Sequence, residues 1–528
     1  MNRRTFLTAT AGAIAATAQA RDQPSEPSGF ELDEVTVSDL QNRLREGSLS
    51  IERITQTYLA RIDRLDRHGP TLRSVIEINP DALAIARDLD TEYKAKGPRS
   101  PLHGIPVVIK DNIDTADKMQ TTAGSLALLG SPAPRDSWVA QKLRAAGAVI
   151  LGKTNLSEWA NFRSTHSTSG WSGRGGQTKN PYALDRNPCG SSSGSGVAVS
   201  ANLAAIAVGT ETDGSVVCPS AMCGIVGIKP TLGLISRSGI VPIAHSQDTA
   251  GPMARSVRDA ALLLGALTGV DNADNSTQAS SGKSYSDYTQ FLDANGLRGA
   301  RIGIARQYFN IGPAVTTLME ECISLMRNAG AQIVDPADLP SYEAWRDTEL
   351  QVLLYEFKAD LNQYLAARGT AVKSIDDCIA FNRAHRDEEM PYFEQELMEQ
   401  AQQKGPLTEK AYKDALATNH RLARKEGIDA VLAKYKVDAI VGPTAGPAWL
   451  TDWVDGDRTD SGCASPPAVA GYPHITVPAG FKFGLPLGIS FFGAAWSEPK
   501  LVKYAYAFEQ ARKARRKPEF LPTVNFYA

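Results

Sequence analysis

The chain has 528 residues, a formal net charge of −2 and a hydrophobic fraction of 42%. These values predict a large globular protein with an ample core, and the length alone does not require several domains. Because acidic and basic residues are interspersed along a nearly neutral chain, we expect neither nucleic acid nor an anionic membrane surface as a partner.

Residues 1–20 have the pattern of an export signal rather than of a folded element. Arg3 and Arg4 precede a weakly apolar Ala/Thr stretch, and residues 18–20, Ala-Gln-Ala, resemble a signal cleavage site. The stretch is too short to span a bilayer, and no later segment has the pattern of a membrane span. The paired arginines resemble a twin-arginine signal, with a Sec signal as the alternative. We expect export by the twin-arginine machinery, cleavage near Ala20, and a mature protein in a bacterial periplasm or outside the cell.

The first part of the folded chain is predicted to be helical. Ser38 and Ser50 each precede apolar residues at helical spacing. Serine is a favoured N-cap because its side chain accepts a hydrogen bond from the first turn of the helix. A third helix is predicted to start at Asn79-Pro80 and to end before Gly97.

A strand–helix–strand pattern follows. The apolar run 105–109 predicts a buried strand, Asp136 opens a helix that Gly147 ends, and residues 148–151 form the next strand. Short connections of this kind are typical of a sheet that helices cover on both faces. Further strands are predicted at 204–208, 225–228, 301–305, 439–441, 474–477 and 488–491.

No repeat or linker divides residues 21–528, so we predict one large α/β domain. At about 335–430 the sequence is charged, helical in pattern and lower in glycine, which predicts a helical insertion that covers the substrate. A chain of this length does not need disulfides, and no C-x-x-C pair indicates zinc. We therefore expect mostly buried free thiols among the six cysteines, Cys189, Cys218, Cys223, Cys322, Cys378 and Cys463.

Lys110 ends the predicted strand at 105–109, in the stretch GIPVVIKDNID. Apolar surroundings remove water from the ammonium group, and this desolvation lowers the pKa of a lysine toward that of a general base. A lysine that ends a strand and extends to solvent is the alternative, and this stretch alone favours the alternative.

The stretch NPCGSSSGSGVAVS, residues 187–200, places serines and glycines before an apolar run. A linker is disfavoured because the apolar run must pack, and a phosphate-binding loop is disfavoured because no Gly-Lys-Ser/Thr follows. Residues 190–194 match the Gly-x-Ser-x-Gly pattern of a nucleophile elbow, which would make Ser192 the nucleophile. That elbow follows a strand directly, whereas loop-forming residues precede this match, so we interpret it as coincidence.

Ser215 follows the strand predicted at 204–208 and a tight turn, and it opens an apolar helical stretch. Unpaired backbone N–H groups and the positive end of a helix gather at such a position and suit a developing oxyanion. An ordinary N-cap serine is the alternative interpretation.

Taken together, the three stretches resemble the amidase signature family. The sequence CGSSSGSGVAVSANLAAIAVGTETDGSVVCPSAMCGIVGIKPTLGLISRSGIVP, residues 189–242, matches that signature almost end to end, and residues 151–162 and 471–493 match flanking blocks. The resemblance covers most of the chain and is weakest at 335–430. It implies the fold of the family, a single α/β domain with a mixed β-sheet core covered by helices on both faces.

The family uses a serine–serine–lysine triad. The resemblance therefore implies Ser215 as the nucleophile, Ser191 as the middle serine after a cis peptide bond, and Lys110 as the base. It also implies amide hydrolysis through an acyl-enzyme, with no metal and no cofactor.

The resemblance assigns further roles around the triad. Backbone N–H groups near Thr212, Asp213 and Gly214, together with that of Ser215, are expected to hold the oxyanion. Gly190 and Ser192 are expected to support the backbone around the cis bond, because glycine permits unusual torsions there.

The forms CGSSSGSG, TETDGS and HSQDTAGPMARS are closest to the peptide amidase branch of the family. This likeness implies hydrolysis of the C-terminal amide of peptides to acid and ammonia. Asp213 would then bind the leaving –NH2 group, with a turn aspartate bonded to the backbone as the alternative. The alternative functions are a broad-specificity aryl or aliphatic amidase and a non-catalytic exported binding protein. The presence of all three triad residues argues against the binding protein.

Two other interpretations were weighed from the sequence. A histidine-based hydrolase is the alternative mechanism, because His245 and Asp248 are close in sequence and His166 lies in a Ser/Thr-rich loop. We interpret these residues as parts of turns and not as a catalytic pair, since the seven histidines also lack the spacing of metal ligands. The glutamine-dependent tRNA amidotransferase subunit of the same family is cytoplasmic and needs partner chains, so the predicted export signal argues against it.

Overall fold

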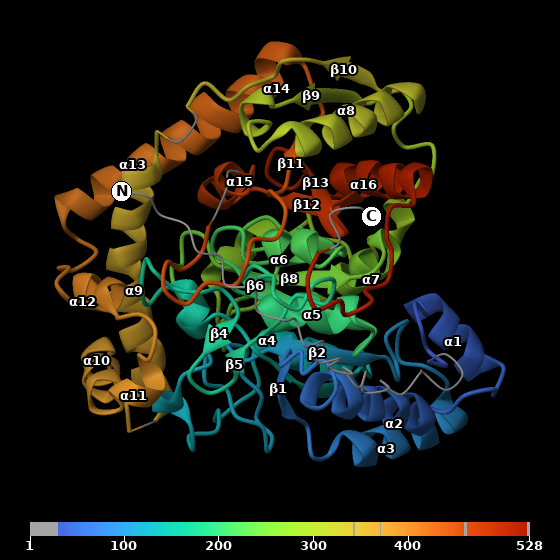
Figure 1. Cartoon of the computed structure of the whole chain (residues 1–528), viewed down its shortest axis with the longest axis vertical. Helices are drawn as coiled ribbons and strands as arrows, with labels where there is room; N and C mark the ends of the chain where they lie inside the picture. The colour runs from blue at the N-terminus through green and yellow to red at the C-terminus, as the bar shows by residue number, and fades with distance from the viewer. Residues whose placement is uncertain (1–29, 342–343, 370, 459–461, 525–528) are drawn as a thin grey trace, which may run out of the picture. The chain divides into compact units, whose positions relative to one another are not determined.

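Eleven strands of the described chain meet in one large mixed sheet, and β4 (Trp171–Ser172) and β5 (Gly176–Gln177) form a separate antiparallel pair (Figure 1). The computed structural model describes residues 30–341, 344–369, 371–458 and 462–524, so the predicted export signal at 1–20 lies outside the described residues. In pairing order the strands are β1 (Val75–Ile78), β3 (Val149–Thr154), β2 (Pro106–Lys110), β6 (Ile206–Glu211), β8 (Thr249–Ala254), β7 (Val226–Lys229), β12 (His474–Lys482), β13 (Leu485–Phe492), β11 (Ala439–Pro443), β9 (Arg301–Ile304) and β10 (Gln332–Val334).

The sheet combines two parallel groups with antiparallel strands between them. β2 is parallel to both of its neighbours, β3 and β6, and β9 is parallel to β10 and β11. The other pairings, from β6 through β8, β7, β12 and β13 to β11, are antiparallel, as is that of β1 with β3. All five residues of β2 are buried, so the strand delivers its last residue, Lys110, into the interior.

Helices pack against both faces of this sheet, as predicted. α5 and α6 contact each other, α7 and α16 contact each other, and both pairs contact the central strands. Residues 34–528 form one unit, and the described residues before it, 30–33, form a turn. The helices outside the predicted insertion are α1 (Val37–Arg45), α2 (Ile51–Ile62), α3 (Ala82–Lys96), α4 (Trp138–Ala145), α5 (Ser193–Ser200), α6 (Val217–Met222), α7 (Val257–Leu267), α8 (Pro313–Asn328), α14 (Asp429–Tyr435), α15 (Ser465–Ala470) and α16 (Glu498–Arg512).

The stretch predicted as a helical insertion contains α9 (Arg346–Arg368), α10 (Ile375–Ala384), α11 (Arg386–Glu389), α12 (Glu396–Gln402) and α13 (Lys410–His420). These helices, gold and orange in Figure 1, gather on one side of the sheet. A buried apolar cluster joins residues of α9, α10 and α12 to residues near 160 and 243 of the body. The insertion is therefore packed on the segments that flank the signature stretch.

The first helices follow the predicted caps with one correction. Ser50 accepts a hydrogen bond from Arg53 N and caps α2 as predicted. Thr36, not Ser38, caps α1, because Thr36 and Asp39 bond each other's backbone in a reciprocal capping box that Ser38 does not form.

The strand pattern was also incomplete as a prediction. The eight runs expected from the sequence all contain strands, whereas β1, β4, β5, β8 and β10 carry no clear pattern. β8 includes Gly251 and Pro252, which disfavour strands, and its pairing with β6 and β7 holds it extended.

The cysteines divide into one pair and four free thiols. Cys189 and Cys218 form a disulfide, because the serine-rich loop and α6 bring their Cα atoms to 6.0 Å. The expectation of buried free thiols holds for Cys223, Cys322, Cys378 and Cys463. Among the described residues, no helix has the length and apolar character needed to cross a membrane.

Candidate active site

Lys110 is fully buried at the end of β2 and does not extend to solvent. Its Nζ lies 2.7 Å from Ser191 Oγ, 2.9 Å from Thr210 Oγ1 and 3.2 Å from the Thr210 carbonyl oxygen. Burial lowers the pKa of Lys110 to about 7, although the carboxyl groups of Asp248 and Glu211 act to raise it. A neutral amine has two hydrogens and one lone pair. The two Thr210 oxygens can accept the hydrogens, and the lone pair then faces the Ser191 hydroxyl.

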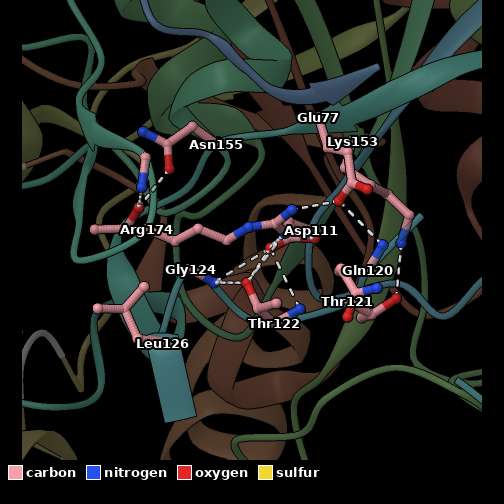
Figure 2. Close-up of polar contacts among 12 residues, drawn as sticks. Glu77, Asp111, Gln120, Thr121, Thr122, Gly124, Leu126, Lys153, Asn155 and Arg174 are labelled. Carbon is pink, nitrogen blue, oxygen red and sulfur yellow. Dashed lines mark hydrogen bonds and ion pairs between the residues drawn. The ribbon is translucent and has the colours of Figure 1, made fainter. Parts of the chain in front are cut away.

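The turn that follows Lys110 is held by a buried polar network (Figure 2). Figure 2 shows Asp111 accepting hydrogen bonds from Thr122 while Arg174 reaches its carboxylate at 3.3 Å. Lys153, from the neighbouring strand β3, donates to a backbone carbonyl and a threonine hydroxyl of the same turn at 2.5 and 2.8 Å. The network fixes the backbone beyond β2 and with it the direction of the Lys110 side chain.

The loop that carries Ser191 is tightly packed. The peptide bond between Gly190 and Ser191 is cis. A Cβ atom at Gly190 would lie 2.2 Å from Ser157 Oγ, so only glycine fits there. Ser157 N donates to the Ser191 carbonyl oxygen at 3.1 Å and so holds the peptide that follows the cis bond.

Ser192 uses its polar groups to join neighbouring segments. Its hydroxyl donates to the Thr210 carbonyl oxygen at 3.0 Å and accepts from Thr210 N at 3.1 Å. Its backbone N donates to the Ser215 carbonyl oxygen at 3.1 Å. The Ser192 hydroxyl therefore faces β6, which favours the predicted supporting role over a nucleophile elbow.

Ser215 lies in the turn between β6 and α6 and lines a cavity of about 690 Å³. α6 begins at Val217, so Ser215 is not its N-cap. Instead, Glu211 accepts hydrogen bonds from the N–H groups of Val216 and Val217 at 2.7 and 3.0 Å. Gly214 has a φ of 75°, which requires glycine in this turn. Thr212, Asp213 and Gly190 line the same cavity.

Backbone donors are available beside Ser215. In the part of the chain that the structure describes, none of the N–H groups of residues 212–215 donates a hydrogen bond. Unpaired N–H groups in a cavity wall suit a developing oxyanion, as the sequence pattern predicts. The hydroxyls of Ser191 and Ser215 form no hydrogen bond with each other in the described structure, and the Ser192 backbone links the two segments.

The turn is held from outside by residues 247 and 248. Asp248 accepts from Thr212 Oγ1 at 2.6 Å, and Gln247 Nε2 donates to the Thr212 carbonyl oxygen at 3.2 Å. His245 faces away from Asp248: its Nδ1 lies 2.8 Å from Asp360, and its Nε2 lies 3.4 Å from Glu356. The structure therefore does not form a His245–Asp248 dyad.

The side chains of Ser465 and Glu349 lie beside the Asp213 carboxyl group and act to lower its pKa. The alternative of a turn aspartate bonded to the backbone is thus not favoured. Glu349, on α9, and Thr210, beside Lys110, are site residues that the sequence pattern did not single out. Thr210 lies inside the signature stretch, whereas a single glutamate in a charged helix carries no signal of its own.

Comparison with known proteins agrees with this geometry. A family model described as Amidase matches residues 53–502. A probable amidase of Arabidopsis thaliana is 42% identical over 504 residues, which cover 94% of this chain and 93% of the relative.

Solved structures of similar proteins include the native peptide amidase from Stenotrophomonas maltophilia. It is 52% identical, with a TM-score of 0.90, and the match covers 93% of this chain and 100% of that one. An amidase family protein from Bacillus anthracis is 38% identical, with a TM-score of 0.85 and 93% of both chains covered. From the family match, these relatives and the eleven-stranded fold, the chain belongs to the amidase family and is an amide hydrolase.

Proposed function

We propose that the protein hydrolyses the C-terminal amide of peptides to the free acid and ammonia, with Ser215, Ser191 and Lys110 as its triad. The observation that carries the proposal is the 2.7 Å contact of Lys110 Nζ with Ser191 Oγ beside the cavity that Ser215 lines. The likeness to the Stenotrophomonas maltophilia peptide amidase supports the choice of substrate.

In the first half of the reaction, Ser215 Oγ attacks the amide carbonyl carbon. The Ser215 proton passes to Ser191 Oγ as the Ser191 proton passes to the neutral Lys110 amine. The N–H groups of residues 212–215 hold the oxyanion. The carbon–nitrogen bond then breaks, the leaving nitrogen takes a proton back through Ser191, and ammonia departs.

In the second half, the same relay runs with water. Water attacks the ester between the acyl group and Ser215 and gives its proton through Ser191 to Lys110. The carbon–oxygen bond breaks, Ser215 recovers its proton, and the peptide acid leaves.

The charges of the cavity support an uncharged C-terminal amide as the substrate. Among the described residues that line it, the acidic side chains are Asp213, Glu349 and Asp457, and the basic side chain is Arg346. An excess of carboxyl groups disfavours a free C-terminal carboxylate, both in a competing substrate and in the product.

Ammonia release from a C-terminally amidated peptide, compared with anilides and simple amides, tests the proposed substrate. We expect the peptide amide to give the highest kcat/KM. Hydrolysis of anilides without hydrolysis of peptide amides would indicate the broad-specificity alternative instead.

The K110A variant tests the mechanism. We expect kcat/KM to fall by at least about 10³-fold, because the relay then lacks its base. Surviving activity in K110A would refute the lysine mechanism.

We further propose that residues 1–20 direct export through the twin-arginine machinery to the periplasm or the medium. The support is the sequence pattern alone, an arginine pair before a weakly apolar stretch. Replacing Arg3 and Arg4 by lysine should leave the protein in the cytoplasmic fraction of a bacterial host. Unchanged export of that variant would favour the Sec alternative.

A further inference from the structure

Glu349 reaches the catalytic cavity from outside the signature sequence. It lies near the start of α9, and only 9% of the residue is exposed. It lines the same cavity as Asp213 and Ser215, although α9 belongs to the part of the chain with the weakest family resemblance. The proposed mechanism gives Glu349 no role.

The contacts of Glu349 connect it to the turn before Ser215 at two points. Gln247 Nε2 donates to Glu349 Oε1 at 3.0 Å and to the Thr212 carbonyl oxygen at 3.2 Å, so one amide bridges them. The carboxyl groups of Glu349 and Asp213 also lie close together, so that Asp213 raises the pKa of Glu349 and Glu349 lowers that of Asp213. Ser465, at the start of α15, also acts to lower the pKa of Asp213.

Two carboxyl groups this close, one buried and the other half-buried, cannot both be ionised without a large cost, so one proton is shared between them. Burial and the neighbouring Asp213 raise the pKa of Glu349 well above its usual range, whereas Arg346 on the same helix acts to lower it. Burial also raises the pKa of Asp213, which Glu349, Ser465 and Lys229 act to lower. Glu349 therefore keeps the proton and Asp213 is the carboxylate.

This protonation state fits every contact. As a neutral acid, Glu349 accepts from Gln247 with its carbonyl oxygen and donates its O–H to Asp213. Asp213 then has both of its oxygens as acceptors. It lies two positions before Ser215 and lines the same cavity.

We propose that Glu349 is a positioning residue: its O–H bond orients the Asp213 carboxylate toward the –NH2 of the substrate amide and so selects unsubstituted amides. The inference rests on the proposed function, because it needs an amide bound at Ser215. An unsubstituted amide offers two N–H donors, whereas an N-substituted amide places carbon where one donor would be. An ester has no N–H and does not use this contact.

The test compares the amide and the methyl ester of one peptide in the full-length protein. We expect E349A to lower kcat/KM for the amide by about 10- to 100-fold, since a hydrogen bond to a charged group is lost, and for the ester by less than about threefold. E349Q should stay within about threefold of the wild type on both, because glutamine also donates to Asp213 and accepts from Gln247. D347A, an exposed position on the same turn, is the matched control and should change neither substrate.

The pH profile supplies a second measurement on the isosteric variant. At alkaline pH the wild type loses the Glu349 proton, two carboxylates face each other, and amide hydrolysis should fall at a lower pH than in E349Q. The inference is overturned if E349A impairs amide and ester equally, if E349Q is as impaired as E349A, or if the alkaline limbs of wild type and E349Q coincide. A wild type that cleaves the ester but not the amide would instead overturn the proposed function, and the inference with it.

Discussion

The hydroxyl groups of Ser192 and Ser215 have different surroundings. Ser192 Oγ is engaged twice by the backbone of Thr210, whereas Ser215 lines the cavity. S215A should lower kcat by at least about 10⁴-fold, because the attacking atom is removed. S192A should cost about tenfold or less, together with about 1–3 kcal/mol of stability, because Thr210 N–H loses its partner. Steady-state kinetics and urea unfolding of both variants check this, and equal losses of activity would reverse the assigned roles.

The charge of Asp248 affects the pKa of Lys110, the proposed base. Its carboxylate raises the pKa of Lys110 against the larger effect of burial, and burial raises the pKa of Asp248 itself to about 6. D248N removes the charge above pH 6 and keeps an oxygen for Thr212. The pKa of Lys110 should then fall, more of the amine should be neutral at a given pH, and the acidic limb of kcat/KM should move down by about one pH unit.

The control for that shift is D360N. Asp360 pairs with His245 and is not among the groups that act on Lys110. We expect its pH profile to match the wild type. An unchanged or upward-shifted limb in D248N would show that Asp248 does not set the protonation of the base.

At the scale of helices and strands, the sequence predicts those elements whose local residue pattern is enough to determine them. β2 is a continuous apolar run and is buried as predicted, whereas its pattern alone favours a Lys110 that extends to solvent, and Lys110 is in fact buried. The sequence pattern does not predict β8, because Gly251 and Pro252 have low strand propensity. Pairing with β6 and β7 holds this segment extended. Local preference and tertiary pairing disagree in β8, and the pairing decides.

The candidate site divides in the same way. Lys110, Ser191 and Ser215 lie in signature stretches, so a resemblance is enough to name them. Glu349 comes to the site only because α9 packs on the segment around residue 243, and nothing in its own neighbourhood in the sequence marks it. Glu349 and the segment around residue 243 are more than a hundred residues apart in the sequence. A motif, which covers only a short stretch, cannot predict a contact between them.

A buried cluster of Arg163, Glu158 and Glu389 anchors the insertion, and its contribution to stability can be tested. Arg163 Nη1 donates to Glu158 at 2.6 Å and to the Glu389 carbonyl oxygen, and all three side chains are fully buried. The guanidinium also lies over the Phe393 ring at 4.2 Å. R163A leaves two buried acids without their cation and should lower the free energy of unfolding by about 3–5 kcal/mol.

Urea unfolding measures that loss against R383A. The Arg383–Glu399 pair is exposed at the surface of the same insertion, at 2.8 Å, and its removal should cost less than about 1 kcal/mol. Equal stability of the two variants would mean that the buried cluster does not anchor the insertion.

At the scale of the whole molecule, the sheet gathers the site from segments that are distant in the chain. β2 supplies the lysine, the loop before α5 supplies Ser191, and the turn after β6 supplies Ser215. α9 and α15 supply Glu349 and Ser465. The disulfide between Cys189 and Cys218 joins the loop of Ser191 to α6, the helix that follows the Ser215 turn. The catalytic geometry is therefore a property of the complete fold and not of any one segment.

The same fold determines which thiols a reagent can reach. Cys223, Cys322, Cys378 and Cys463 are fully buried, and burial raises the pKa of each thiol, so little reactive thiolate forms. A thiol reagent should label no cysteine in the native protein, four in denaturant, and all six after denaturation with reduction. C322S should lower each of the last two values by one. Six reactive thiols in denaturant without reductant would show that Cys189 and Cys218 are not paired, and rapid labelling of the native protein would show that the core around a free cysteine opens.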